Sequence, residues 1–252
     1  MVIASGCGTR LTEKMEFGKV ADFVAGVQAE VVTKGPDEVE VYFGRKVAPG
    51  FFAWLVPTSA GNARVGLLSR DTPDKYLKRL LDSLASEGKI AAGEWKPSHG
   101  AIPLRPLRKT FGERILVVGD AAGQVKPTTG GGIYYGMLCA DIAATELNRA
   151  LHRDDLSARS LSRYDREWRR KLGRELMVGY GARRLFERLS DQQIDRLFSV
   201  VEKHGIDASL LKSSDVSFDW HSQAIMSLLR RAVVARIFGG IKLPFGKGKN
   251  TQ

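Results

Sequence analysis

Alternation of apolar and polar residues dominates the first part of the chain. It predicts β-strands, which we place at 21–32, 38–43, 51–56 and 64–68. Lys34-Gly35-Pro36-Asp37 is typical of a turn between the first two, and Ser59-Ala60-Gly61-Asn62 connects the last two. We therefore expect a four-stranded antiparallel meander, with residues 99–104 as a further strand.

Helical spacing appears next. Apolar residues recur every three or four positions in 74–86, and Gly88 then ends the predicted helix. The short apolar run 114–118 predicts a strand buried on both faces, and it stops at Gly119. A glycine-rich loop at 127–132 leads into a predicted helix of small and apolar residues at 133–151.

The remainder of the chain is predicted to be helical. A single apolar stripe runs along one predicted helix and consists of Leu161, Tyr164, Trp168, Leu172 and Leu176. Segments 191–204 and 222–238 are further helix candidates. The chain begins as if at the end of a strand, with Met1 to Gly6 leading into a glycine turn, so we expect it to be the later part of a longer protein.

Composition narrows the class of protein. The 252 residues are 43% apolar and 27% charged, which excludes a disordered tail, a collagen and a disulfide-stapled miniprotein. No run of about 18 apolar residues predicts a membrane span. The chain has two cysteines, Cys7 and Cys139, and no secretory signal pattern, so we expect a reducing, cytoplasmic location.

Charge is distributed unevenly. Residues 149–252 hold 21 basic and 12 acidic side chains, and they therefore carry most of the net charge of +11. A basic region of this kind can bind anionic lipid, nucleic acid or an acidic partner, and it can equally be a set of solvated helix faces.

The segment from Val117 to Ile133 carries the most specific chemical pattern. Asp120 follows a buried strand, at the strand end where open α/β sheets bind ligands. Gly130 to Gly132 allow close approach of a ligand and open a helix, whose first N–H groups favour negative charge. An aspartate that can accept hydrogen bonds from ligand hydroxyl groups, beside such a helix start, suits a flavin nucleotide. A tight strand–loop–helix crossover without a ligand is the structural alternative.

This segment resembles a known signature. Gly119-Asp120-Ala121-Ala122-Gly123 with Pro127-Thr128-Thr129-Gly130-Gly131-Gly132-Ile133-Tyr134-Tyr135-Gly136 is similar to the second flavin-binding motif of the geranylgeranyl reductase family. These are FAD-dependent enzymes of the p-hydroxybenzoate-hydroxylase-like group. Phe52-Ala53-Trp54-Leu55-Val56-Pro57, followed by Gly66, resembles the aromatic-x-Trp-x-x-Pro…Gly substrate motif of that family.

The resemblance implies roles for these residues. Asp120 would bind the ribityl chain of FAD, and Gly130 to Ile133 would direct backbone N–H groups to the N1/O2 edge of the isoalloxazine. An aromatic-lined tunnel would hold the isoprenoid chain of a prenyl lipid. The implied cofactor residues are Gly119, Asp120, Ala121, Gly123, Pro127, Gly130, Gly131, Gly132 and Ile133, and the implied substrate residues are Phe52, Trp54, Pro57 and Gly66.

The implied reaction is hydride transfer from reduced flavin to an isolated carbon–carbon double bond. No residue identifies the proton donor, so the catalytic residues and the electron donor are unassigned. His99 is a candidate neighbour of the site, Cys139 is expected to be packed, and Trp54 has an ordinary place in a sheet core as its structural alternative. No metal site is predicted.

Two features depart from the family pattern. Ser5 occupies the position where the group usually carries an aspartate in an Asp-Gly turn. The N-terminal βαβ unit with G-x-G-x-x-G is missing from this sequence, since Gly6 and Gly8 are followed by Leu11. A partial gene product, a trimmed chain and one half of a split enzyme are all compatible with this.

We therefore predict an α/β (α+β) fold: an incomplete FAD-binding domain with an antiparallel substrate-binding sheet and a C-terminal helical region. The predicted division is 1–20, a remnant of the FAD-binding domain; 21–104, the substrate sheet and helix; 105–152, the FAD-binding strand–loop–helix; and 153–252, helices.

Two other classes stay open. One is a different flavoprotein of the same group, such as a monooxygenase or an electron-transfer-flavoprotein dehydrogenase, although no cysteine cluster for an iron–sulfur centre is present. The other is a non-catalytic module whose basic helix around Arg230, Arg231 and Arg236 lies on an anionic membrane. That helix also suggests peripheral membrane contact for the enzyme. No nucleic-acid partner is expected, because no recognition motif accompanies the charge.

Overall fold

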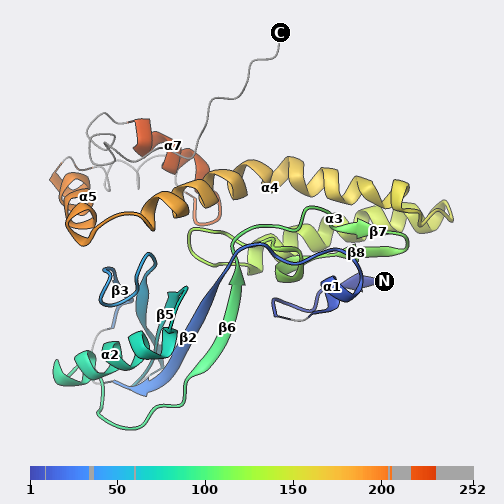
Figure 1. Ribbon diagram of the computed structural model, residues 1–252. Coiled ribbons are helices and arrows are strands. Elements are labelled where there is room, and N and C mark those ends of the chain that lie inside the picture. The colour runs from blue at the N-terminus through green and yellow to red at the C-terminus, as the bar shows by residue number, and fades with distance from the viewer. Residues whose placement is uncertain (9, 34–36, 60, 204, 206–216, 231–252) are drawn as a thin grey trace. The chain divides into compact units, whose positions relative to one another are not determined.

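The computed structural model describes residues 1–8, 10–33, 37–59, 61–203, 205 and 217–230 (Figure 1). The chain divides into two compact units. One comprises Met1–Asp22, Pro103–Phe186 and Asp195–Gln252, and the other Phe23–Ile102 and Glu187–Ile194. The four-part division made from the sequence stays a prediction.

A five-stranded antiparallel sheet forms the second of these units. Its strands lie in the order β3-β4-β5-β2-β6, where the bounds are β2 (Phe23–Val32), β3 (Glu40–Tyr42), β4 (Ala53–Ser59), β5 (Asn62–Ser69) and β6 (Ser98–Pro103). The longest ladder joins β2 to β5, from Ala25 opposite Ser69 to Val32 opposite Asn62. This sheet confirms the predicted antiparallel architecture and the further strand at 99–104.

The predicted meander is wrong in its order. In a meander β2 would pair with β3, whereas β2 pairs with β5 and β3 lies at the edge beside β4. The long β2 has a full-length partner in β5, but β3 is three residues long and offers little ladder. Residues 34–36 of the predicted turn lie outside the described residues.

Helix α2 (Pro73–Ser86) covers one face of this sheet (Figure 1). Alternate residues of the three central strands point toward it, and each is almost fully buried. The resulting core contains Val27, Ala29, Val31, Ala53, Leu55, Ala63, Val65 and Leu67 from the sheet with Leu77, Leu80, Leu81 and Leu84 from the helix. The predicted helix at 74–86 is thus confirmed.

The first unit is built on a small three-stranded sheet in the order β1-β8-β7. β1 (Val2–Ile3) is parallel to β8 (Ile115–Val117), and β7 (Phe111–Gly112) is antiparallel to it. Leu116 and Val117 are fully buried, as the apolar run predicted. A short helix, α1 (Leu11–Lys14), follows β1, and the 3₁₀ turn η1 (Gly119–Ala122) follows β8.

Two long helices pack on this sheet. α3 (Ile133–His152) and α4 (Ala158–Phe186) lie against each other, and all five residues of the predicted apolar stripe are buried on α4. Trp168 in that stripe donates its indole N–H to Thr110 Oγ1 at 2.8 Å, which satisfies the buried nitrogen. The helices predicted from the 3.6-residue period are therefore present.

The last elements are α5 (Asp191–Lys203) and α7 (Ser222–Arg230). α7 packs on α4. The predicted helix 222–238 is confirmed as far as residue 230, and its remainder, with Arg231 and Arg236, lies outside the described residues. Among the helices that the structure describes, none is long and apolar enough to cross a membrane.

Candidate functional site

The chain turns sharply at the carboxyl end of β8, and this turn places Asp120. Gly119, the first residue of η1, and Gly123, which follows it, both have φ +72°, a left-handed conformation that glycine adopts without strain. A Cβ atom on Gly123 would stand 2.4 Å from the carbonyl oxygen of Arg105. Residue 123 is therefore glycine for two reasons, its backbone angle and the backbone that crosses it.

A buried hydrogen-bond chain fixes this turn. The Gly119 N–H donates to Gln124 Oε1 at 2.8 Å, and Gln124 Nε2 donates to the Tyr164 hydroxyl at 2.9 Å. That hydroxyl in turn donates to the Val117 carbonyl at 2.9 Å. The sequence analysis missed Gln124, and it assigned Tyr164 only to a core stripe. No local pattern could reveal a link across 40 residues.

The glycine-rich loop lies directly beside Asp120. Two backbone hydrogen bonds close the loop, from Lys126 N to the Gly131 carbonyl at 3.0 Å and from Gly130 N to the Lys126 carbonyl at 2.9 Å. A Cβ atom on Gly132 would stand 2.6 Å from Oδ1 of Asp120. The absence of a side chain at 132 thus leaves room for the carboxylate at the start of α3, whose first-turn N–H groups lack carbonyl partners within the helix.

Asp120 sits in a partly desolvated place. Burial raises its pKa above the ordinary aspartate value, and its own backbone N–H lowers the pKa by a smaller amount. Burial also raises the pKa of the Cys7 thiol, and the nearby charge of Asp120 adds to that increase. The predicted N-terminal glycine turn, in which Gly6 and Gly8 have positive φ, therefore lies near Asp120.

The remaining predicted cofactor residues follow the same path. Ala121 and Pro127 are buried, and Gly130 has φ +77°. A Cβ on Gly179 of α4 would lie 3.3 Å from the Pro127 ring, so α4 approaches the loop closely there. The Ile133 side chain is 84% exposed. An aliphatic side chain that points into solvent at a helix start has no packing role among the described residues.

Three of the four predicted substrate residues, Phe52, Trp54 and Gly66, lie on the face of the five-stranded sheet opposite α2. The Trp54 indole lies across Gly66 of the neighbouring strand, since a Cβ on Gly66 would stand 2.5 Å from the Trp54 ring. The Phe52 ring centroid is 5.9 Å from that of Trp54, and the Phe43 centroid is 6.4 Å from that of Phe52. Three aromatic rings thus form one continuous apolar row.

Pro57 has a different position. It lies on β4, three residues after Trp54, and the ladder to β5 is irregular between Pro57 and Ser59. Since strand side chains alternate between faces, Pro57 does not share the face of Phe52 and Trp54. Its place at a register irregularity fits a residue that has no N–H to donate to a ladder.

The other candidate residues do not join these groups. His99 Nε2 lies 2.7 Å from Asp74 Oδ1 on the exposed surface of the sheet unit. Cys139 is fully buried in α3, and burial raises its pKa to about 12, so it is packed as expected. Among the described residues, no three His, Cys, Asp or Glu side chains form a cluster suited to a metal ion.

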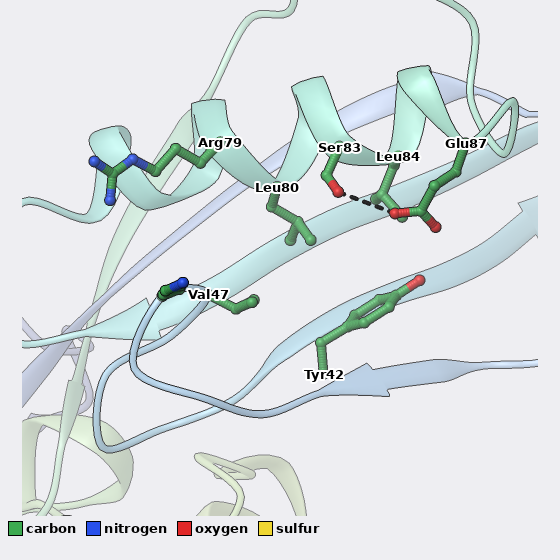
Figure 2. Close-up of a pocket in the computed structure, with 8 residues that line it drawn as sticks. Tyr42, Val47, Arg79, Leu80, Ser83, Leu84 and Glu87 are labelled. Carbon is green, nitrogen blue, oxygen red and sulfur yellow. Dashed lines mark hydrogen bonds between the residues drawn. The ribbon is translucent and has the colours of Figure 1, made fainter. Parts of the chain in front are cut away.

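A separate cavity of about 580 Å³ lies between α2 and the chain around β3. Figure 2 shows Leu80 and Leu84 of α2 facing Val47 and the Tyr42 ring, with a hydrogen bond from Ser83 to Glu87 at one end. Burial and a hydrogen bond to Glu40 raise the pKa of Tyr42 to about 12. None of the predicted site residues lines this cavity.

Comparisons with known proteins point to the same family as the sequence motifs. The chain is 35% identical over 214 residues to digeranylgeranylglycerophospholipid reductase 2 of Methanothermobacter thermautotrophicus, a match that covers 80% of this chain and 54% of that protein. It is 38% identical over 164 residues to digeranylgeranylglycerophospholipid reductase of Methanocaldococcus jannaschii, covering 63% of this chain and 42% of that protein. The chain spans about half the length of the curated relatives it matches. No protein-family model matches it.

Solved structures share the fold. A geranylgeranyl bacteriochlorophyll reductase-like protein from Thermoplasma acidophilum superposes with a TM-score of 0.70 at 22% identity, over 88% of this chain and 56% of that one. A flavin-dependent brominase superposes with a TM-score of 0.58 at 15% identity, over 90% of this chain and 60% of that one. At these identities the likeness concerns the fold alone, and it confirms the predicted mixed α/β architecture.

Proposed function

We propose that this chain supplies the substrate sheet of a prenyl-lipid reductase and the contacts to the ribityl chain and ring system of its flavin. The chain belongs to the geranylgeranyl reductase family. The cofactor is FAD, which when bound would provide the hydride for reduction of an isoprenoid carbon–carbon double bond. The relatives whose printed names describe digeranylgeranylglycerophospholipid reductases support a prenyl lipid as the substrate class.

The residues around Asp120 fit a flavin nucleotide. The carboxylate would accept hydrogen bonds from ribityl hydroxyls, and these would compensate for its partial burial. The Gly130 N–H donates to the Lys126 carbonyl, so the N–H groups of Gly132 and Ile133 at the start of α3 would be the ones directed toward the edge of the ring system where negative charge develops. The exposed Ile133 side chain would rest against bound cofactor.

The aromatic row fits an isoprenoid chain. Phe52 and Trp54 present apolar ring faces, and Gly66 lets the indole lie flat on the sheet. A polyprenyl tail binds through apolar area rather than through hydrogen bonds, so a row of adjacent aromatic rings is a surface that suits it.

One observation carries the proposal: Oδ1 of Asp120 lies 2.6 Å from where a Cβ of Gly132 would stand, in a place that burial makes unfavourable for its charge. A crossover without a ligand needs neither feature. The first test is flavin content. The purified protein is examined for a visible flavin spectrum and is then titrated with FAD while its fluorescence is followed.

Asp120→Ala is compared with Asp141→Ala, which alters an exposed aspartate on α3. We expect saturable FAD binding that Asp120→Ala weakens and Asp141→Ala leaves unchanged. Equal binding by both variants, or none by the unaltered protein, would contradict a flavin site in this chain. Reduction of a prenyl lipid with a chemically reduced flavin is the second assay, and oxygen-dependent hydroxylation would favour the monooxygenase alternative.

Peripheral membrane contact is a separate proposal. It depends on the basic segment after residue 230, which lies outside the described residues. Sedimentation with anionic liposomes, compared before and after removal of residues 222–252, tests it. Binding that survives the truncation would exclude this segment as the lipid contact.

A further inference from the structure

Residues 218–222 lie against the glycine-rich loop and are fastened to it by side chains. Lys126 Nζ is 2.7 Å from Asp219 Oδ1 and donates to the Phe218 carbonyl at 3.1 Å. The Tyr135 hydroxyl donates to the Asp219 carbonyl at 2.8 Å. These contacts join parts of the chain that are more than 80 residues apart.

Helix α4 fixes the same segment from the other side. The Glu175 carboxylate accepts the N–H groups of His221 and Ser222 at 3.0 and 2.9 Å, and it also accepts the Ser222 hydroxyl. A carboxylate at the first N–H groups of a helix stabilises that helix end. The start of α7 is therefore hydrogen-bonded to α4 through Glu175, and Asp219, just before it, is ion-paired with Lys126 of the loop.

His221 adds a bond that does not depend on its charge. Its Nε2 donates to the Phe218 carbonyl at 2.9 Å, so Nδ1 of the neutral ring accepts from the Thr128 hydroxyl at 2.8 Å. In the protonated ring Nδ1 would instead donate to the same hydroxyl oxygen. The bond between the segment and the loop thus persists in both states.

Lys126 is the residue through which the segment shapes the loop. Its exposed fraction is 5%, and its ammonium lies 4.7 Å from the centroid of the Phe218 ring. Its Cε would be 2.8 Å from a Cβ on Gly131, so the side chain fills the space directly behind that glycine. Its backbone also makes both hydrogen bonds that close the loop.

Removing the partner of a buried lysine leaves an uncompensated buried charge, which is strongly unfavourable. If Asp219 no longer carried a charge, the Lys126 side chain would gain by moving toward water, and the space behind Gly131 would empty. The backbone at Gly131 and Gly132 would then no longer pack against the Lys126 side chain.

We infer that Asp219 is a positioning residue, which through Lys126 holds the glycine-rich loop in the shape that receives the cofactor. The inference rests on the proposed function for the identity of the cofactor. The coupling between Asp219 and the loop is a property of the protein without flavin, and it can be measured there.

The test uses Asp219→Asn, with Asp141→Asn as the matched control. Hydrogen exchange of a peptide spanning residues 126–136 is measured without flavin, and FAD affinity is measured by titration. We expect Asp219→Asn to speed exchange in this peptide and to weaken FAD binding, each by about tenfold, the lower end of what a charge-assisted hydrogen bond contributes, because asparagine keeps one acceptor oxygen. Peptides from β8 and from residues 161–172 of α4, which belong to the same compact unit as Asp219, should exchange as in the unaltered protein, which shows that folding is intact.

A double variant separates pairing from general disruption. Lys126→Met with Asp219→Asn removes both charges and keeps an unbranched side chain behind Gly131, so we expect it to recover most of the loop protection. Unchanged loop exchange in Asp219→Asn, or a double variant worse than the single one, overturns the inference. Faster exchange in a protein that never binds FAD supports the coupling and contradicts the flavin proposal instead.

Discussion

Asp120→Asn is the substitution that best separates a ligand site from a structural turn. Asparagine keeps the size and shape of the side chain, removes its charge and replaces one acceptor oxygen by an NH2 group. Apart from its own backbone N–H, no described group donates a hydrogen bond to the Asp120 carboxylate, so the substitution removes no hydrogen bond to another described residue. Bound FAD would lose a charge-assisted hydrogen bond worth about 1.5–3 kcal/mol. Its dissociation constant should therefore rise by roughly 10- to 150-fold.

Asp120→Asn should weaken FAD binding but raise the stability of the folded protein without flavin. Burial raises the folded-state pKa of Asp120 above its unfolded value of about 3.9. The folded state then binds this proton more tightly, so stability is lost as pH rises from the unfolded pKa through the folded one. Asp120→Asn removes the loss, and its thermal midpoint at pH 7 should exceed that of the unaltered protein. The difference should disappear below about pH 3.9, where the unaltered aspartate is protonated in both states.

The assay combines thermal melts at several pH values with FAD titration, and Asp141→Asn again serves as the control. A lower midpoint for Asp120→Asn at pH 7 would mean that the carboxylate has a structural partner. Unchanged FAD affinity would mean that Asp120 does not touch the cofactor. Either result would refute the prediction, because a carboxylate that serves a ligand costs stability in the free protein and contributes to FAD binding.

Three further substitutions test close backbone packing at two glycines and the buried hydrogen bonds of Tyr164. Gly123→Ala should destabilise the protein by at least about 2 kcal/mol in urea unfolding, because a left-handed angle and the Arg105 carbonyl at 2.4 Å both oppose a side chain; a neutral result would contradict the close approach. Gly66→Ala should cost about 1–3 kcal/mol and shift the tryptophan emission, since it displaces the Trp54 indole; unaltered emission would count against that packing. Tyr164→Phe should cost about 1–3 kcal/mol by leaving buried polar groups unpaired, and full stability by denaturant titration would show that the chain of bonds is dispensable.

The helices and the strand–loop–helix were predictable because their signals are local. The stripe from Leu161 to Leu176 lies within one helix, and the spacing that predicts it is the spacing that buries it. The turn around Asp120 was predictable for a similar reason. Gly119 and Gly123 take left-handed angles that few other residues tolerate, so the local backbone is recorded in the sequence.

The pairing of the sheet was not predictable in the same way. Alternation identifies a strand and its two faces but not its neighbour. The sequence placed β2 beside β3 because they are adjacent in the chain, whereas the ladder formed with β5 is much longer. Strand order depends on total ladder length and buried area, which no single segment contains.

Partners from distant parts of the chain were hidden for a related reason. Gln124, Glu175 and Asp219 are polar residues in ordinary contexts, and each acquires its role only when another segment arrives. The link from Lys126 to Asp219 spans 93 residues, so nothing near either one distinguishes it from a solvated charge.

At Gly66 and at Gly132 a side chain would clash with a neighbouring group, and only the clash at Gly132 points to a ligand. Gly66 is explained within the protein, since the Trp54 indole occupies the space that a side chain would need. Gly132 is different, because the atom that occupies its space is an Asp120 carboxylate oxygen whose charge is itself disfavoured by burial. A fold gains nothing from making room for a charge that it then desolvates. An outside group that supplied the missing hydrogen bonds would offset this cost, and this is the physical reason why we propose a binding site at the end of β8.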